Sequence, residues 1–380
     1  MIYMDSAATT PVRPEVLRAM WPFLSNDFGN PSSHHSVGDI AARALADARA
    51  RVAAVLGCRP KEIVFTSGGT EADNLAIKGI ALANPRGHHI VTTAIEHEAV
   101  LASSDYLARH HGFEITYVPV DTCGAVRPDS FDRALRPDTT LCTIILANNE
   151  VGTIQPVREL AAIARGRGIP FHTDAVQAAG ALDIQPDSLG VDALSLSGHK
   201  IGAPKGIGVL YLRRRVVVEP VIHGGGQESG RRSGTENVAS AVAFATALEI
   251  AAADSESRTA RLRENRDLLI TGILQHVPGA VLTGHPTGRL PGHASFCFAG
   301  TSGESVLLAL EERGILCSSG SACAAGSDEP SHVLVAMGFE RELAQTAVRF
   351  SFGDEITSDQ IDLVIRSVVE AVRTLTALAS

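Results

Sequence analysis

The sequence predicts an α/β protein in which a mainly parallel, seven-stranded β-sheet carries helices on both faces. This expectation rests on the alternation of β-rich runs with helical stretches between residues 61 and 212, which is typical of βαβ units. After residue 254 the pattern changes, and a smaller α+β domain is expected at the C-terminus. The β-rich runs lie at residues 62–65, 89–92, 114–118, 141–146, 169–172 and 193–196.

A long amphipathic helix over residues 38–56 precedes these runs. A further strand is expected over residues 207–212, and it is a candidate to run antiparallel. The apolar stretch 238–253 is interrupted by Glu249 and is too short for a membrane span, so we expect a core helix there. The intervening helices are predicted at residues 70–82, 98–110, 130–135 and 157–165.

The C-terminal part begins with a charged helix over residues 256–276. Apolar runs at residues 294–298 and 346–352 then indicate further strands. We therefore predict two domains, a large one over residues 14–254 and a small one made of residues 1–13 and 255–380.

Composition and charge exclude several classes of protein. Of the 380 residues, 45% are hydrophobic and 20% charged, and the net charge is −9, which argues against direct binding to nucleic acid. The N-terminus lacks a basic segment followed by an apolar one, so we expect no signal peptide, no membrane association and a cytoplasmic location. The six cysteines include no CxxC pair, so neither a metal site nor a disulfide framework is expected.

Lys200 is the residue that first indicates a chemistry. Lysine occurs at only four positions, whereas the other 29 of the 33 basic residues are arginine. A lysine amine can lose its proton and form a Schiff base, which a guanidinium cannot do. Lys200 also lies in the loop 197–200 after a predicted strand, where open α/β sheets bind ligands. A solvated loop lysine is the alternative interpretation.

Polar residues also follow two other predicted strands. The segment 66–74 is rich in glycine, and Gly69 and Thr70 at its helix start could bind a phosphate. A glycine turn capped by threonine is the alternative. Asp174 ends an apolar strand and needs a cation or a donor, because a buried, unpaired carboxylate is costly. A pyridinium nitrogen is one such partner, and a role as helix N-cap is the alternative.

Two more junctions carry candidate residues. His97 begins a predicted helix, where its ring could stack on a planar cofactor and shuttle protons; a surface histidine is the alternative. Asn149 lies in segment 148–152 after an apolar strand, and its amide could position a ligand. A simple turn explains that segment as well.

The run 317–326 consists almost entirely of small residues, with Gly320 and Gly326 on either side of Cys323. Such a composition favours a mobile loop that carries a thiolate nucleophile to a substrate. Cys317 directly follows an apolar stretch and is expected to be structural.

Taken together, these residues resemble the cysteine desulfurases, which are pyridoxal-5′-phosphate enzymes of the aminotransferase-like fold type I. The similarity runs from residues 5–10 through 28–33 to 349–351 and so covers nearly the whole chain. Its most specific parts are the Ser-Gly-His-Lys segment ending at Lys200 and the Ser-Ser-Gly-Ser-Ala-Cys run ending at Cys323. Residues 329–332 resemble the long-loop subgroup of the family.

The resemblance implies a role for each position that would hold the cofactor. Lys200 would bind pyridoxal 5′-phosphate through its amine and later move the substrate Cα proton. Asp174 would pair with the pyridinium nitrogen, His97 would stack on the ring and Gln177 would bond its phenolic oxygen. The phosphate would be held by Gly69, Thr70, Ser197 and His199, joined by Thr235 from the neighbouring subunit of a homodimer.

The resemblance also implies the substrate and the product. Arg349 and Asn149 would clamp the carboxylate of L-cysteine, a task suited to a guanidinium fork. Cys323 would attack the substrate sulfur, leaving a persulfide on the enzyme and releasing L-alanine. A sulfur-acceptor protein would then take the persulfide sulfur.

Two other functions stay open: a related lyase or aminotransferase acting on another amino acid, and a non-enzymatic sulfur carrier or scaffold. Cys323 in its small-residue loop argues against the first, and the set of cofactor residues argues against the second. The acceptor pathway is also open among iron–sulfur cluster assembly, tRNA thiolation and DNA phosphorothioation. No extended C-terminal tail of the kind some relatives use to dock scaffold proteins is recognised.

Overall fold

The computed structural model describes residues 1–83, 86–253, 255–319 and 329–379. Its largest sheet has seven strands in the order β2-β8-β7-β6-β5-β3-β4, as predicted. The strands β3 to β7 pair in parallel, whereas β8 runs antiparallel to both β7 and β2. The bounds are β2 (Ile63–Thr66), β3 (His89–Thr93), β4 (Glu114–Val118), β5 (Thr139–Thr143), β6 (Phe171–Asp174), β7 (Ala193–Ser197) and β8 (Gly208–Leu212).

Strand β5 differs most from its prediction, and β6 lies two residues later than predicted. Residues 141–146 were expected as a single strand, but β5 begins at Thr139 and ends at Thr143. The amides of Ile144 and Leu146 still donate to carbonyl oxygens of β6, at 3.2 and 2.8 Å. The apolar run therefore predicts a buried segment that remains hydrogen-bonded to β6 after the regular strand β5 ends.

Alternate side chains of the strands pack on opposite faces of this sheet. On one face Val64 and Leu210 pack with α3 (Gly69–Ala83) and α4 (Glu98–His111). On the other face Phe65 and Val209 pack with a second group of helices. That group includes α1 (Pro14–Ser25), α2 (Ser36–Leu56), α5 (Pro128–Ala134), α6 (Val157–Gly166) and α8 (Val238–Ala252).

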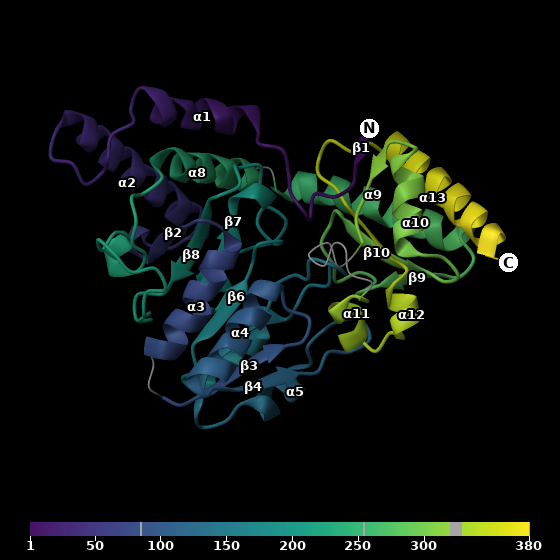
Figure 1. The fold of residues 1–380 in the computed structure, drawn as a ribbon, viewed down its shortest axis with the longest axis horizontal. Helices are drawn as coiled ribbons and strands as arrows, with labels where there is room; N and C mark the ends of the chain where they lie inside the picture. The colour runs from purple at the N-terminus through teal and green to yellow at the C-terminus, as the bar shows by residue number, and fades with distance from the viewer. Residues whose placement is uncertain (84–85, 254, 320–328, 380) are drawn as a thin grey trace.

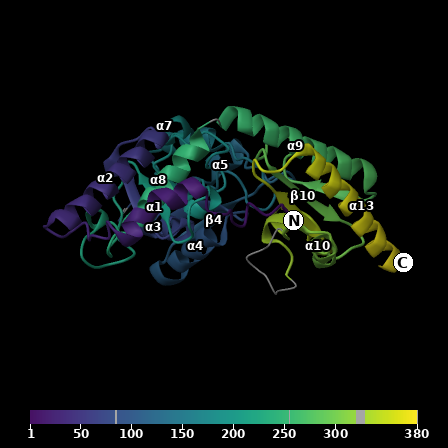
Figure 2. The same ribbon diagram turned by 90° about the horizontal axis from the view of Figure 1, so that it is seen from above.

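The C-terminal part has its own sheet, with antiparallel strands in the order β12-β10-β9. The N-terminal β1 (Ile2–Tyr3) pairs in parallel with β11 (Ile315–Leu316) and so lies with this part, as Figure 1 shows. Figure 2 shows α9 and α13 side by side along its outer surface. The other elements are β9 (Ala280–Thr283), β10 (His293–Phe298), β12 (Ala347–Ser351), α9 (Ser255–His276), α10 (Gly303–Glu311), α11 (His332–Ala336), α12 (Arg341–Ala344) and α13 (Ser358–Ala379).

Most buried apolar residues separate in the same way, although a smaller cluster joins Ile95 and Val151 to Cys297 and Val333. One core lies between residues 16 and 251, whereas another joins Ile2 and Met4 to residues 262–372. This separation supports the two predicted domains, and we keep the boundaries at residues 13/14 and 254/255 as a proposal.

No single helix in the described ranges is long and apolar enough to cross a membrane. The pair Val238–Ala252 and Glu256–His276, bent by 72°, meets the length and composition requirements when both helices are counted together.

Candidate active site

A cavity of about 580 Å³ opens at the carboxyl ends of β6 and β7, where open α/β sheets bind ligands. The first turn of α3 and the start of α4 form part of its wall, and the C-terminal part closes it with β12 and α11. Ten of the predicted site residues line this cavity: Gly69, Thr70, His97, Asn149, Asp174, Gln177, Ser197, His199, Lys200 and Arg349.

Lys200 ends the short 3₁₀ helix η2 (Gly198–Lys200) directly after β7. Its Nζ donates hydrogen bonds to the backbone carbonyls of Ala7 and Ala8, at 2.5 and 2.8 Å. The N-terminal segment thus covers the amine. Lys200 is half-buried, and these two hydrogen bonds favour a site residue over a solvated loop lysine.

Asp174 is the last residue of β6, and only 4% of it is exposed. Burial raises the pKa of its carboxyl, while the nearby His97 and Lys200 act in the opposite direction. The amide of Val176 donates to Asp174 Oδ1 at 2.9 Å. Turns rather than a helix follow, so the alternative of a helix N-cap is wrong. Asp174 is a buried acid that a cationic partner would stabilise.

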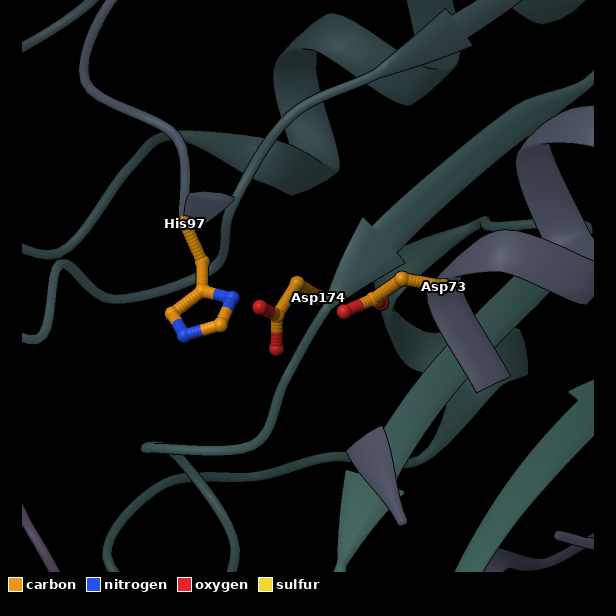
Figure 3. A group of neighbouring side chains, drawn as sticks. All are labelled: Asp73, His97 and Asp174. Atoms are coloured by element: carbon orange, nitrogen blue, oxygen red, sulfur yellow. The ribbon is translucent and has the colours of Figure 1, made fainter. Parts of the chain in front are cut away.

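His97 caps α4, because its Nδ1 accepts a hydrogen bond from the amide of Ala99 at 3.1 Å. Figure 3 shows its ring beside the carboxyl group of Asp174, with Asp73 on the other side of Asp174. A ring nitrogen of His97 and one carboxylate oxygen each of Asp73 and Asp174 all lie within 4.8 Å of one another. His97 thus has the predicted place in the site and also caps a helix, and it is half-buried rather than on the surface.

The far wall of the cavity offers donors for an anion. Gly69 begins α3, and a Cβ there would lie 2.9 Å from Val176 Cγ2 and 3.4 Å from Ser197 Cβ. Thr70 lies in the first helical turn, so it does not cap the helix. Amides at a helix N-terminus and nearby hydroxyl groups bind phosphate well. Burial, which is the largest cause, and the charge of Lys200 lower the pKa of His199 to about 4, so its ring is neutral.

Two further residues reach the cavity as predicted. Gln177 Nε2 donates to the carbonyl of Ala7 at 3.0 Å. Arg349, on β12, donates through Nη2 to Asp5 Oδ1 at 2.8 Å and through Nη1 to the carbonyl of Asn149 at 2.9 Å. Arg349 Nε is buried and has no hydrogen-bond partner among the described residues.

Two predicted site residues are not brought together with the others. Thr235 is exposed and does not line the cavity of its own chain. Cys323 lies outside the described residues.

Several cavity residues were not predicted as site residues. Asp73 lies one helical turn after Gly69, Glu150 directly follows Asn149, and His332 follows Ser331 at the start of α11. The Asp73 spacing was a usable signal, since residues i and i+4 share a helix face. Donor atoms as close as those of Asp73, His97 and Asp174 could hold a metal ion or a pyridinium. The amine of Lys200 and the hydrogen-bond donors for a phosphate at the start of α3 line the same cavity, and they favour the pyridinium. The absence of a metal stays a prediction.

Comparisons with known proteins identify the family to which the chain belongs. The family model described as aminotransferase class-V matches residues 2–364. The chain belongs to this family. The family uses pyridoxal 5′-phosphate, and the predicted resemblance and fold are thereby confirmed.

Relatives and solved structures match over nearly the full length. A protein named cysteine desulfurase IscS from Methanosarcina thermophila is 49% identical over 375 residues, which are 98% of this chain and 92% of the relative. A solved NifS-like protein has a TM-score of 0.92 and 38% identity, covering 98% of this chain and all of that one. The structure titled SspA in complex with cysteine has a TM-score of 0.83 and 37% identity, covering 94% of this chain and all of that one.

Proposed function

We propose that this protein is a pyridoxal-phosphate-dependent cysteine desulfurase, which converts L-cysteine to L-alanine and carries the sulfur as a persulfide on Cys323. The observation that carries the proposal is the meeting of Lys200, Asp174 and His97 in one cavity beside a helix N-terminus. Relatives named cysteine desulfurases at 44–49% identity support the same activity.

The residues present fit the cofactor. Asp174 is a buried acid whose pKa burial raises and whose ionised form the charges of His97 and Lys200 favour, which suits a pyridinium nitrogen. At the end of the cavity where α3 begins, Gly69 is packed so closely that a Cβ would lie 2.9 Å from Val176 Cγ2. We assign Lys200 to the covalent hold on the cofactor, His97 to the ring face and Gln177 to the phenolic oxygen. Gly69, Thr70, Ser197 and His199 would hold the phosphate.

Bound pyridoxal phosphate supplies an electron sink for the carbon skeleton of the substrate. Lys200, once released, would move the proton at the substrate Cα. Arg349 is held in place by Asp5 and by the carbonyl of Asn149, and this preorganisation supports a role for Arg349 and Asn149 in binding the substrate carboxylate.

The sulfur-transfer step needs a second nucleophile. The Cys323 thiolate would form a bond to the substrate sulfur while the carbon–sulfur bond breaks. The bonding electron pair would stay with the carbon skeleton, and a proton added there would give L-alanine. The sulfur on Cys323 would then pass to a thiolate of the acceptor protein.

The active enzyme would be a homodimer. Thr235 is exposed and lies outside the cavity of its own chain, so it can reach a phosphate only in a second copy. Thr235 is two residues from Asn237, the cap of α8, and α8 packs against α1. On α1 and just after it, the exposed side chains of Leu17, Trp21, Leu24 and Phe28 could be covered by that copy.

We propose a cytoplasmic location and no direct contact with nucleic acid or membrane, in line with the net charge of −9. The sulfur would leave through an acceptor protein toward iron–sulfur clusters, thiolated tRNA or phosphorothioated DNA. Co-purification of the acceptor from the native host distinguishes these pathways.

The visible absorption spectrum, recorded before and after L-cysteine is added, tests the function. We expect a yellow lysine-bound cofactor whose band shifts with L-cysteine, together with released L-alanine. Cys323→Ser should retain the band and lose persulfide formation, whereas the control Cys123→Ser should retain both. A protein that stays colourless after pyridoxal phosphate is added would contradict the enzymatic function.

A further inference from the structure

Asp73 lies directly behind Asp174 in the wall of the cavity. It projects from α3, one turn after Gly69, and only 1% of it is exposed. Figure 3 shows its carboxyl group directed toward that of Asp174. The cavity thus places two acids from separate elements, α3 and β6, against each other without intervening bulk solvent.

No cation compensates Asp73 among the residues that the structure describes. Its Oδ1 atom is buried and accepts no hydrogen bond there. The basic group within 4.0 Å of it is His172, with Nε2 at 3.6 Å. His172 bonds Ser195 Oγ through Nε2 and Thr143 Oγ1 through Nδ1, at 2.9 and 2.8 Å. Burial lowers the pKa of His172 to about 3, so this ring carries no charge at neutral pH.

The other charged groups near Asp73 make ionisation harder still. Burial is the main cause that raises its pKa well above the usual value, and the charges of Asp174 and Glu96 add to it. Each acid accepts one hydrogen bond that favours its ionised form, Asp73 from Ser195 and Asp174 from the amide of Val176. However, the charges of His97 and Lys200 favour ionisation of Asp174. When two adjacent buried acids with similar hydrogen bonds share one proton, the acid with fewer cations beside it holds it.

We propose that Asp73 is a positioning residue that holds the proton of the Asp73–Asp174 pair and so leaves Asp174 as the single negative charge of this wall. As a neutral acid, Asp73 fills the space behind Asp174 without repelling it. Asp174 then stays directed into the cavity as a carboxylate that can pair with a pyridinium. This last consequence rests on the proposed function, whereas the position of the proton does not.

Infrared spectroscopy of the protein at pH 7 tests where the proton lies. The difference spectrum of wild type minus Asp73→Asn should contain the carbonyl stretch of a protonated carboxyl group. The same difference for Asp105→Asn, at an exposed acid paired with Arg109, should contain only carboxylate bands. A carboxylate signal for Asp73 would overturn the proposal, whether or not the protein binds pyridoxal phosphate.

The dissociation constant for pyridoxal phosphate, measured on reconstituted apoprotein, tests the positioning role. Asp73→Asn should stay within about threefold of the wild type and keep the absorption maximum, since an amide has the same shape and no charge. Asp73→Ala should weaken binding about tenfold, because water would enter behind Asp174. Equal losses in both variants, or no loss in either, would overturn the positioning role. If Asp73→Ala does not fold, Asp73→Ser takes its place in the measurement.

Discussion

The two halves of the cavity are built differently. On the sheet side Asp174, Ser197 and Lys200 occupy the ends of neighbouring parallel strands, and Gly69 begins a helix. Their positions follow from the backbone of the large sheet. On the C-terminal side Arg349 enters from a separate sheet and is held by an ion pair to Asp5.

This difference separates two tasks. Groups at strand ends are held rigidly and suit a cofactor that stays bound, since rigid elements position a site more accurately than loops. The position of the Arg349 guanidinium depends on hydrogen bonds to residues far away in the chain. A substitution of Arg349 is therefore expected to leave the sheet side of the cavity in place. Variants of the two halves should therefore affect different measured quantities.

The largest effect is expected for Lys200→Ala on the sheet side. Loss of the amine should lower alanine release roughly 10⁴-fold, the upper range for a positioned acid–base group, and remove the band of the covalently held cofactor. Lys205→Ala, at an exposed lysine of the same loop, should change neither quantity. Full activity of Lys200→Ala would show that another amine holds the cofactor and moves the proton.

A change in the C-terminal half should affect the substrate alone. Arg349→Gln should lower kcat/KM for L-cysteine about 100-fold, because a charge-assisted hydrogen bond contributes about 1.5–3 kcal/mol. The dissociation constant for pyridoxal phosphate should stay at the wild-type value. The control Arg366→Gln, at an exposed residue of α13, should change neither kcat/KM nor this dissociation constant. Equal losses of cofactor and substrate binding would contradict the separation of the two halves.

A milder change on the sheet side should affect cofactor binding. Gly69→Ala places a Cβ 2.9 Å from Val176 Cγ2, and overpacking of about 1–3 kcal/mol predicts roughly tenfold weaker binding of pyridoxal phosphate. Adding Val176→Ala should restore part of the affinity, because it removes the contacting methyl group. Strictly additive losses in this double-mutant cycle would show that the contact is not the cause.

A further effect is expected on the stability of the fold rather than on the reaction, and it concerns Glu96, which joins the two halves. Its side chain accepts from the amide of Ile145, and its carbonyl accepts from His332 Nε2, at 3.1 and 3.0 Å. Burial raises the pKa of Glu96 from 4.5 to about 8. Between these values the folded chain keeps a proton that the unfolded chain releases, so stability is highest below pH 4.5 and falls toward pH 8.

At pH 8 the free energy of unfolding of Glu96→Gln should therefore exceed that of the wild type by about 4 kcal/mol, which denaturant unfolding measures. The two proteins should differ less at pH 5. Glu264→Gln on exposed α9 is the matched control and should follow the wild type at both values. An unchanged pH dependence in Glu96→Gln would mean that Glu96 is ionised in the folded protein.

Sequence reasoning placed ten of its twelve site residues in the cavity wall. Lys200 and Asp174 were accessible because each follows an apolar strand, and strand ends of a parallel sheet meet at one edge. The spacing of Asp73 from Gly69 indicated a shared helix face, but its significance depends on a carboxyl group about a hundred residues later in the chain. His332 and Glu150 were missed for the same reason, since they meet only when α11 packs beside the large sheet.

The sequence by itself determined the fold class and the kind of chemistry. Hydrophobic periodicity is a local property that decides helix and strand, and an amine, a carboxylate and a thiol are identities that folding does not alter. The tertiary structure alone decided which acid holds a proton, which side chains line one cavity and that Thr235 lies outside it. Desolvation and charge–charge interactions depend on all neighbours of a group, and elements distant in the chain supply those neighbours.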